Sequence, residues 1–189
     1  MRVIAGKYRS RPLQSLRGMD IRPTSDRLRE TLFDVLCAGN PSALEGTIWL
    51  DLYAGTGAVG IEALSRGAAR VIFVELCAKA AALIEKNLAS LGVEDGFQVL
   101  RFEMPTALRK LETAGLAGDF FFLDPPYRME QAYGETLQAL AGSKLLKPPS
   151  LVVAEHSRRF DPGEEFANLR RYRKLEQGDA ALSFYRLAE

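Results

Sequence analysis

The fold of this chain is decided by residues 48–60, which read Ile-Trp-Leu-Asp-Leu-Tyr-Ala-Gly-Thr-Gly-Ala-Val-Gly. The first half is short, apolar and aromatic, which is typical of a buried β-strand. The second half spaces Gly55, Gly57 and Gly60 as G-x-G-x-x-G, directly before a helical pattern. A strand, a glycine-rich turn and a helix in this order predict a parallel α/β sheet that binds a nucleotide-like ligand at the turn.

Asp51 makes the glycine pattern more specific, because G-x-G-x-x-G alone also occurs in NAD-binding proteins. It stands four residues before Gly55, in a strand that is otherwise apolar. D-x-x-x-G-x-G resembles the first motif of S-adenosylmethionine (SAM) methyltransferases. In that motif the glycines let the backbone approach the cofactor, and the acid faces its methionine end. Glu75 ends the next apolar run, where it can accept the ribose hydroxyls of NAD or of SAM.

A second motif, Asp124-Pro125-Pro126-Tyr127, follows the buried-strand pattern of residues 120–123. Two consecutive prolines stiffen the turn, and their carbonyl groups remain free to accept hydrogen bonds. An exocyclic amine can donate to Asp124 and to the Pro125 carbonyl while Tyr127 stacks on the ring. The pattern is typical of enzymes that methylate exocyclic amines of nucleobases. An ordinary surface turn is the alternative, and the SAM-like motif upstream argues against it.

From residue 47 onward, strand and helix patterns alternate. Strands are predicted at 48–53, 70–75, 97–101, 119–123 and 150–154, and helices at 58–66, 78–91, 104–113 and 130–141. Two last strands, 170–176 and 181–186, flank a tight turn and must be antiparallel. We therefore expect an α/β, Rossmann-like SAM-dependent methyltransferase fold with helices on both faces of a seven-stranded, mostly parallel sheet. The methyltransferase resemblance implies an antiparallel C-terminal hairpin and the strand order 3-2-1-4-5-7-6.

Residues 1–40 are expected to form an RNA-contacting extension, and residues 41–189 the methyltransferase domain. The extension is predicted to be a short basic hairpin at 2–13, followed by a helix that begins at Thr24 or Ser25. Residues 1–30 hold eight basic and three acidic side chains, although the net charge of the whole chain is only +1. This asymmetry is typical of nucleic-acid contact, and a merely solvated basic surface is the alternative. The predicted RNA contacts are Arg2, Lys7, Arg9, Arg11, Arg22, Arg27 and Arg29.

Composition narrows the function classes further. With 189 residues, 47% of them hydrophobic, the chain can build one domain with a sizeable core. No apolar run approaches the length of a membrane span and no signal peptide is recognisable, so we expect a cytoplasmic protein. One histidine and two cysteines, far apart in sequence, argue against a zinc site and a cysteine nucleophile. We read His156 as structural.

Nearly the whole chain resembles one family through four stretches, residues 2–6, 22–33, 51–68 and 123–127. That family is the bacterial 16S rRNA (guanine(966)-N(2))-methyltransferases. The resemblance implies SAM as cofactor and 16S rRNA or the assembled 30S subunit as substrate, and we expect a monomer without a metal. It implies catalytic roles for Asp124, Pro125, Pro126 and Tyr127, and cofactor contacts from Asp51, Tyr53, Gly55, Thr56, Gly57 and Glu75.

Methyltransferases usually carry Asp or Asn after the third strand, near the adenine, where this chain has Glu103. Either Glu103 takes that role or the backbone alone holds the adenine. The expected reaction moves the methyl group of SAM to guanine N2, while Asp124 and the Pro125 carbonyl orient the amine. The target base must lie in a loop or be flipped out to reach such a pocket.

Three other functions remain open at this point. An adenine-N6 DNA methyltransferase would use the same Asp-Pro-Pro-Tyr motif, but generally needs a separate target-recognition domain. An NAD(P)-dependent oxidoreductase would use the same glycines and Glu75, yet no hydride-transfer site is recognisable. A pure RNA-binding module would use the basic segment and leave Asp51 and the motif at 124–127 unexplained.

Overall fold

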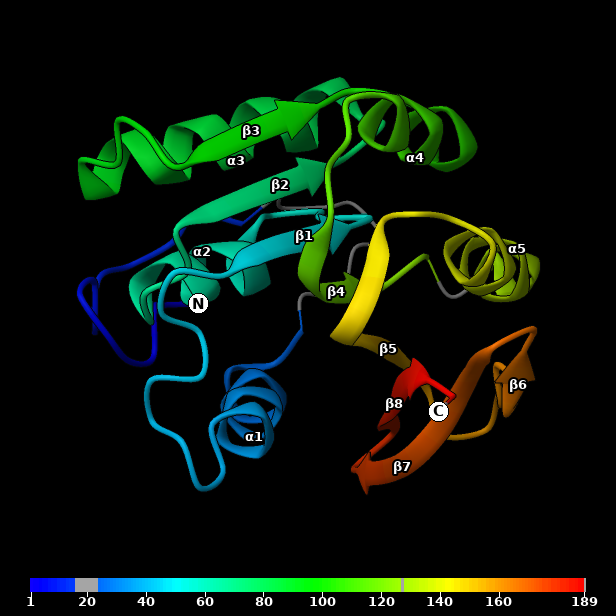
Figure 1. Cartoon of the computed structure of the whole chain (residues 1–189). Coiled ribbons are helices and arrows are strands. Elements are labelled where there is room, and N and C mark those ends of the chain that lie inside the picture. Colours follow the sequence, from blue (N-terminus) through cyan, green and yellow to red (C-terminus); the bar gives the residue numbers. More distant parts are fainter. Residues whose placement is uncertain (16–23, 127, 189) are drawn as a thin grey trace.

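The structure is a computed structural model that describes residues 1–15, 24–126 and 128–188. In these residues, an eight-stranded sheet with helices on both faces forms the centre of the protein (Figure 1). The strand order is β3-β2-β1-β4-β5-β8-β7-β6. The parallel strands are β1 (Ile48–Leu52), β2 (Arg70–Val74), β3 (Phe97–Leu100), β4 (Gly118–Leu123) and β5 (Leu146–Ser157). The antiparallel strands are β6 (Glu165–Phe166), β7 (Leu169–Gln177) and β8 (Ala180–Leu187).

The expected Rossmann-like methyltransferase fold and its strand order are confirmed, but the expected number of strands is wrong by one. The additional strand, β6, has two residues and pairs only with β7 at the edge of the sheet. A strand this short shows no alternation in sequence, which explains why the pattern did not predict it.

Strand β5 is longer than the expected 150–154, because it begins at Leu146 and continues through three polar residues, Glu155, His156 and Ser157. Glu155 and His156 are both buried, and they pair with Leu182 and Ala181 of β8. The ring of His156 bonds to the Ser183 hydroxyl at 2.9 Å. A buried polar side chain is tolerated when it has such a partner. The prediction that the strand ends before these polar residues was therefore wrong.

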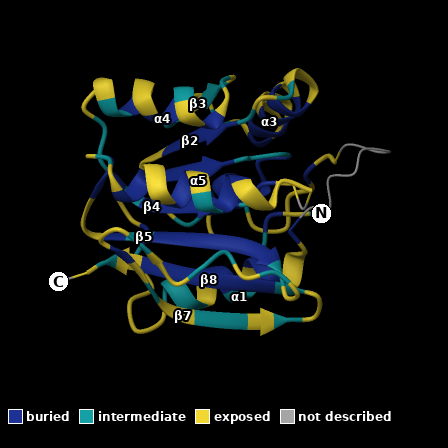
Figure 2. Ribbon diagram, turned by 90° about the vertical axis from the view of Figure 1, so that its right-hand side faces the viewer, coloured by how far each residue is buried: buried dark blue, intermediate teal, exposed yellow. Residues whose placement is uncertain are grey.

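Among the described residues, five helices cover the two faces of the sheet: α1 (Asp26–Leu36), α2 (Ala58–Ser65), α3 (Ala78–Leu91), α4 (Met104–Thr113) and α5 (Glu130–Ala141). Side chains of α1, α2 and α3 share one core cluster, and those of α4 and α5 share the other. The central strands β1, β2 and β4 are almost wholly buried, whereas β7 is mostly half-buried or exposed (Figure 2). In the described part of the chain, no helix has the length and apolar character that crossing a membrane would require.

Helix α1 is joined to the sheet through stacked aromatic rings. The indole of Trp49 on β1 lies 5.3 Å from the ring of Phe33 on α1 and 5.5 Å from that of Phe120 on β4. All three rings are buried. Offset aromatic pairs at such distances add about 0.5–1.5 kcal/mol beyond area burial. The expected helix start is also confirmed, since Ser25 caps α1 by accepting a bond from the Leu28 N–H.

The N-terminal arm, residues 1–15, folds back on itself through one isolated bridge between Arg2 and Pro12. The expected hairpin is therefore present as a turn with a single bridge, without regular strands in this described segment. The arm lies along α2, where the Lys7 N–H donates to the Ser65 carbonyl at 2.7 Å. A Cβ added at Gly6 would lie 1.8 Å from that carbonyl oxygen, so only glycine permits this approach.

Glu62 fixes the arm from inside the protein. Its carboxylate is fully buried and accepts from the N–H groups of Ile4 and Ala5 at 2.8 and 2.9 Å. It also pairs with Arg66 at 2.8 Å, and the Nε of Arg29 lies 3.7 Å away. A buried carboxylate with several donors is satisfied, and it joins the arm, α1 and α2 into one unit.

Arg29 is consequently a correction to the expected RNA contacts. Its side chain is fully buried, donates to the Arg2 carbonyl and pairs with Asp26 at 2.9 Å. It cannot reach a phosphate from this position. The sequence placed Arg29 among basic neighbours, but its position on the inner face of α1, beside Leu28, turns it toward Glu62.

We predict that Glu62→Ala lowers the free energy of unfolding by about 3–5 kcal/mol, because it leaves the buried Arg29 guanidinium without this partner. Urea denaturation measures the loss. The matched control is Glu85→Ala on the exposed face of α3, which should change stability by less than about 0.5 kcal/mol. A loss below about 1 kcal/mol in Glu62→Ala would contradict this role.

Candidate active site

A cavity of about 390 Å³ opens where the carboxyl ends of β2, β1 and β4 meet. Its volume is in the range of small-molecule sites in proteins. Strand order reverses at this point, because β1 connects through α2 to β2 on one side and pairs with the later strand β4 on the other. Ligands of open α/β sheets bind at such a switch point.

The glycine-rich turn between β1 and α2 forms one wall of this cavity. Gly55 lines it, and Gly57 begins α2 with φ of 76°, a left-handed conformation that glycine adopts without strain. A Cβ added at Gly60 would lie 2.4 Å from the Phe73 ring, so glycine there lets α2 pack closely on β2. Glycine is thus favoured at position 57 by the backbone conformation and at position 60 by the close packing of α2 on β2.

Asp51 ties this turn to the strand before it. Its side chain is only 2% exposed, and one carboxyl oxygen accepts from the Gly60 N–H at 2.8 Å. Burial raises the pKa of Asp51 to about 8, since the low-dielectric surroundings disfavour its charged form. The bond from Gly60 opposes that rise, and the charge of Glu75 adds to it.

Glu75 is held in place by two backbone N–H groups. One carboxyl oxygen accepts from the Gly55 N–H and the other from the Cys77 N–H, each at 2.8 Å. A carboxylate has about four acceptor sites, so two of them remain for a ligand. Because the carboxylate is already oriented, hydroxyl groups of a ligand can bind it without ordering the side chain.

Asp124 follows β4 and is half-buried at the inner end of the cavity. Its pKa is raised well above the usual range, first by burial and then by the nearby charges of Glu155 and Asp51. Pro125 and Pro126 line the cavity beside it. The cavity thus brings the Asp124 carboxyl group, with its raised pKa, next to the stiff turn of Pro125 and Pro126.

A buried tyrosine braces this turn. The Tyr133 hydroxyl donates to the Glu155 carbonyl at 2.8 Å and lies 3.5 Å from the Pro125 carbonyl oxygen. On the other side, the Thr24 hydroxyl donates to a carboxyl oxygen of Glu155 at 2.7 Å. Bonds from α5 and from the segment before α1 therefore fix the strand end next to Asp124.

The structure brings together most of the predicted site residues. The cavity is lined by Asp51, Tyr53, Gly55, Thr56, Glu75, Asp124, Pro125 and Pro126. The predicted stacking residue Tyr127 lies outside the described residues, as does Arg22 among the predicted RNA contacts. The exposed predicted RNA contacts are Arg2, Lys7, Arg9, Arg11 and Arg27.

Glu103 is exposed and is not part of the cavity lining, and its contact with the adenine stays a prediction. It occupies the N-cap position of α4, so its side chain lies at the outer start of the helix. The neighbouring apolar residues Phe102 and Met104 line the cavity instead.

Sequence reasoning also missed Leu76 and Met129, which line the cavity although their side chains are 58% and 50% exposed. Exposed apolar side chains at a cavity mouth are typical of surfaces that a ligand covers. Leu76 could have been predicted from the sequence, because it directly follows Glu75, the acid after β2. Met129 carried no comparable signal.

The residues of this cavity fit SAM. Apolar walls from Leu76, Phe102 and Met104 suit a flat purine, and Glu75 suits the hydroxyl groups of a ribose. Burial raises the pKa values of Asp51 and Asp124, and the positively charged end of such a ligand would favour their ionised forms. Within the described residues, His, Cys, Asp and Glu side chains form no group of three that could hold a metal ion.

Comparison with known proteins agrees with this geometry. Residues 1–186 match the family described as conserved hypothetical protein 95. YlbH of Bacillus subtilis (strain 168), an rRNA methyltransferase by name, is 36% identical over 189 residues that cover 98% of each chain. Ribosomal RNA small subunit methyltransferase D of Escherichia coli (strain K12) is 34% identical over 155 residues, 82% of this chain and 74% of that protein. A solved structure of an Escherichia coli protein named as the methyltransferase yhhF superposes with a TM-score of 0.83 at 29% identity, over 100% and 98% of the two chains.

We predict that the stability difference between wild type and Asp51→Asn depends on pH. The folded protein keeps the Asp51 proton up to about pH 8, whereas the unfolded chain loses it near pH 4. Because the folded state binds more protons in this window, rising pH lowers wild-type stability relative to the always neutral Asn variant, by at most about 1.4 kcal/mol per pH unit.

Above about pH 8 both folded and unfolded Asp51 are ionised, so the difference should become constant. Urea denaturation of both proteins between pH 5 and 9 measures it. Other titrating groups are common to both proteins and largely cancel. A difference that stays the same from pH 5 to 8 would show that Asp51 is ionised throughout.

Proposed function

We propose that this chain, which belongs to the family described as conserved hypothetical protein 95, transfers a methyl group from SAM to the exocyclic N2 amine of a guanine in 16S rRNA. The observation that carries the proposal is the stiff turn of Asp124 and Pro125 in the same cavity as the glycine-rich turn. The names of the rRNA-methylating relatives support the RNA substrate.

The cofactor supplies an electrophilic methyl group. In the proposed arrangement, Glu75 holds the ribose, while Leu76 and Phe102 enclose the adenine. The turn at Gly55 leaves room for the backbone to approach the ligand, and Asp51 lies toward its charged end. All of these groups line the cavity, and Asp51 and Glu75 are fixed by backbone hydrogen bonds before any ligand arrives. Such preorganisation reduces the ordering cost of binding.

Asp124 and the Pro125 carbonyl would orient the amine of the target base. Two acceptors at fixed positions can bind its two N–H groups, which aims the nitrogen lone pair into the cavity. Positive charge builds on the nitrogen as the new bond forms, and a carboxylate at this point stabilises it. Since its raised pKa makes Asp124 a stronger base than an ordinary aspartate, its carboxyl oxygen can then take the proton that the methylated amine releases.

The target guanine must leave its stack to enter this cavity, so we propose a base in an RNA loop or a flipped-out base. We further propose that residues 1–40 form the RNA-contacting part of a monomeric protein. Both ends of the described arm lie near Thr56 of the cavity. The Thr56 hydroxyl donates to the Met1 sulfur at 3.8 Å, and Asn87 bonds both to the backbone of Gln14 and to the Thr56 carbonyl. The arm can therefore guide RNA toward the site.

We predict that Asp124→Ala lowers the rate of methyl transfer about a hundredfold, which is the usual effect of losing one electrostatic contact to the transition state. Binding of the SAM product S-adenosylhomocysteine, measured by calorimetry, should change much less. In the wild type the rate should rise with pH as Asp124 loses its proton, and Asp124→Asn should remove that rise. Turnover near the wild-type level in Asp124→Ala would overturn the mechanism.

The substrate is tested with the wild-type protein, labelled SAM and three acceptors: naked 16S rRNA, assembled 30S subunits and DNA. We expect N2-methylguanine in the digested rRNA, identified by mass spectrometry. N6-methyladenine as the product would assign the chain to the adenine class, and labelled DNA in place of RNA would refute the proposed substrate.

We also predict that Lys7→Gln combined with Arg9→Gln weakens RNA binding and reduces its salt dependence. Both side chains are exposed on the arm. Each lost phosphate contact should lower the slope of log K against log salt by about 0.9. Fluorescence anisotropy at several salt concentrations measures the slope, with the exposed pair Lys79→Gln and Lys86→Gln on α3 as control. Equal slopes in both variants would mean that the arm is only a solvated basic surface.

A further inference from the structure

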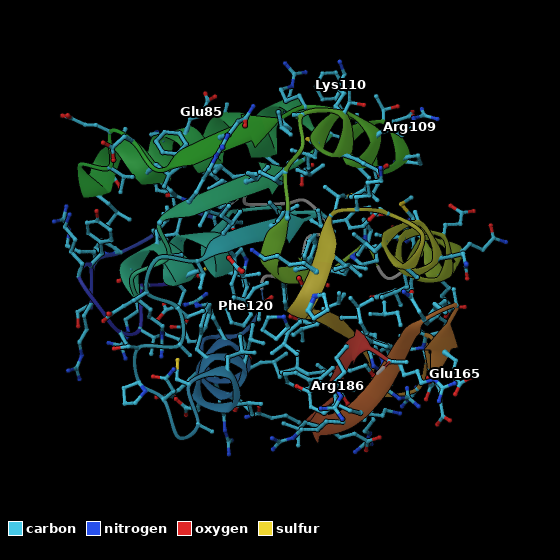
Figure 3. The ribbon with its side chains drawn as sticks, viewed as in Figure 1. Glu85, Arg109, Lys110, Phe120, Glu165 and Arg186 are labelled. Carbon is cyan, nitrogen blue, oxygen red and sulfur yellow. The ribbon has the colours of Figure 1, made fainter. Side chains whose placement is uncertain are left out.

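The C-terminal hairpin of β7 and β8 carries a second group of basic side chains, far along the chain from the N-terminal arm. We name it the hairpin arginine face, and its residues are Arg170, Tyr172, Arg173 and Arg186. All four side chains are exposed. Figure 3 shows Arg186 at the surface of this hairpin. The proposed function does not use this group.

Strand pairing places these side chains on one side of the sheet. Arg170 lies opposite Arg186, and Arg173 lies opposite Phe184. Phe184 packs in the core cluster that includes Phe33 of α1, so this side is the one that α1 covers. The N-terminal arm contacts α2, which packs against the same core cluster. Both basic regions therefore lie on the side of the sheet that α1 and α2 cover.

A bulge brings an aromatic ring onto this face. The register of β7 against β8 shifts between Arg171 and Arg173, and Tyr172 is the extra residue. Its side chain is 44% exposed and lies 6.3 Å from the Phe184 ring. The guanidinium of Arg186 stands 5.3 Å from the centre of the Tyr172 ring. Bulges commonly redirect a side chain, and an arginine against an aromatic ring is a frequent feature of RNA-binding surfaces.

On the opposite side of β7, basic side chains pair closely with carboxylates of the segment that precedes β6. There, Arg171 pairs with Asp161 at 2.6 Å and with Glu164 at 2.9 Å, and Lys174 lies 3.4 Å from Asp161. One side of β7 is thus largely neutralised by its own carboxylates.

The hairpin arginine face lacks this compensation. In the described ranges of the chain, no carboxylate forms an ion pair with Arg173 or Arg186. Arg170 has one distant partner, Glu165 at 3.6 Å, and both side chains are more than half exposed. Such an exposed pair contributes little. Three guanidinium groups therefore remain available to an anionic partner.

Protection of an edge strand is the simplest alternative explanation for charges on β7, since β6 covers only its first residues. Any charge serves that purpose, however, and acids would do so as well as arginines. Edge protection accounts neither for the difference in ion pairing between the two sides of β7 nor for the exposed aromatic ring. Both features fit the recognition of a phosphate backbone.

We propose that the hairpin arginine face is a second RNA-contacting surface, which binds the phosphate backbone of the methylated RNA at a distance from the target base. The proposal rests on the proposed function and extends it. Register pairs Arg186 with Leu151 near the start of the β5–β8 pairing, whereas Glu155, beside Asp124, pairs with Leu182. The arginines thus extend along the sheet away from the cavity. A contact there would add affinity and orientation without touching the reacting atoms.

The test compares two double variants that remove the same charge. Arg173→Gln with Arg186→Gln changes the hairpin arginine face, and Arg109→Gln with Lys110→Gln changes exposed cations on α4, across the sheet (Figure 3). Binding of a 16S rRNA fragment is measured by fluorescence anisotropy against potassium chloride concentration. We expect the hairpin variant to bind about tenfold more weakly at 0.1 M salt, with a slope lower by about 1–2, and the α4 variant to match wild type.

Affinity for S-adenosylhomocysteine and the rate at saturating RNA should stay at the wild-type level in the hairpin variant. Equal losses in both variants, or a hairpin variant with wild-type affinity and slope, would overturn the second surface. Gel filtration gives an independent check: a hairpin variant that self-associates while its monomer binds RNA normally would assign the arginines to edge protection instead. If wild type neither binds nor methylates the RNA, the proposed function itself fails, and that result is distinct from the others.

Discussion

Four neighbouring strands of this sheet have a carboxyl group at or near their carboxyl ends, and the site depends on keeping these groups close together without unpaired charge. In spatial order they are Glu75, Asp51, Asp124 and Glu155. Parallel strands bring such ends to one edge, and burial then makes each charge costly. The protein compensates with donors from its own backbone and from Thr24, and with a raised pKa at Asp51 and Asp124. A site built in this way is rigid and is suited to a ligand that brings positive charge.

The same principle holds on the other side of α2, where the buried Glu62 joins the arm to the domain. Its bonds to Ile4 and Ala5 make the arm part of the structure rather than a loose basic tail. Since the glycine-rich turn leads into the helix that carries Glu62, arm and cavity share one support. Basic side chains on this arm, such as Arg9, are consequently attached to a backbone of defined position, which would lower the ordering cost of the proposed RNA contact.

Sequence patterns predicted the elements and the acids of the site well, because both follow from local periodicity and from strand ends. Helices 78–91, 104–113 and 130–141 have the predicted bounds, and Asp51, Glu75 and Asp124 line one cavity. The failures concern partners that are distant in sequence. Arg29 is buried because Glu62 lies opposite it, and β5 extends through His156 because Ser183 accepts or donates there. Charge and polarity alone cannot reveal such partners.

The size of the cavity constrains how the RNA can be recognised. About 390 Å³ accommodates little more than a cofactor and part of one base. Under the proposed function, contacts inside it can select the exocyclic amine, but they cannot distinguish one guanine of a long RNA from the many others. Selection among guanines would then have to come from surfaces outside the cavity, where backbone contacts fix the position and orientation of the folded RNA. The arm and the C-terminal hairpin both carry exposed arginines and lie on the side of the sheet that α1 covers. Two separated contacts on one folded protein would define an orientation of the RNA that a single contact could not.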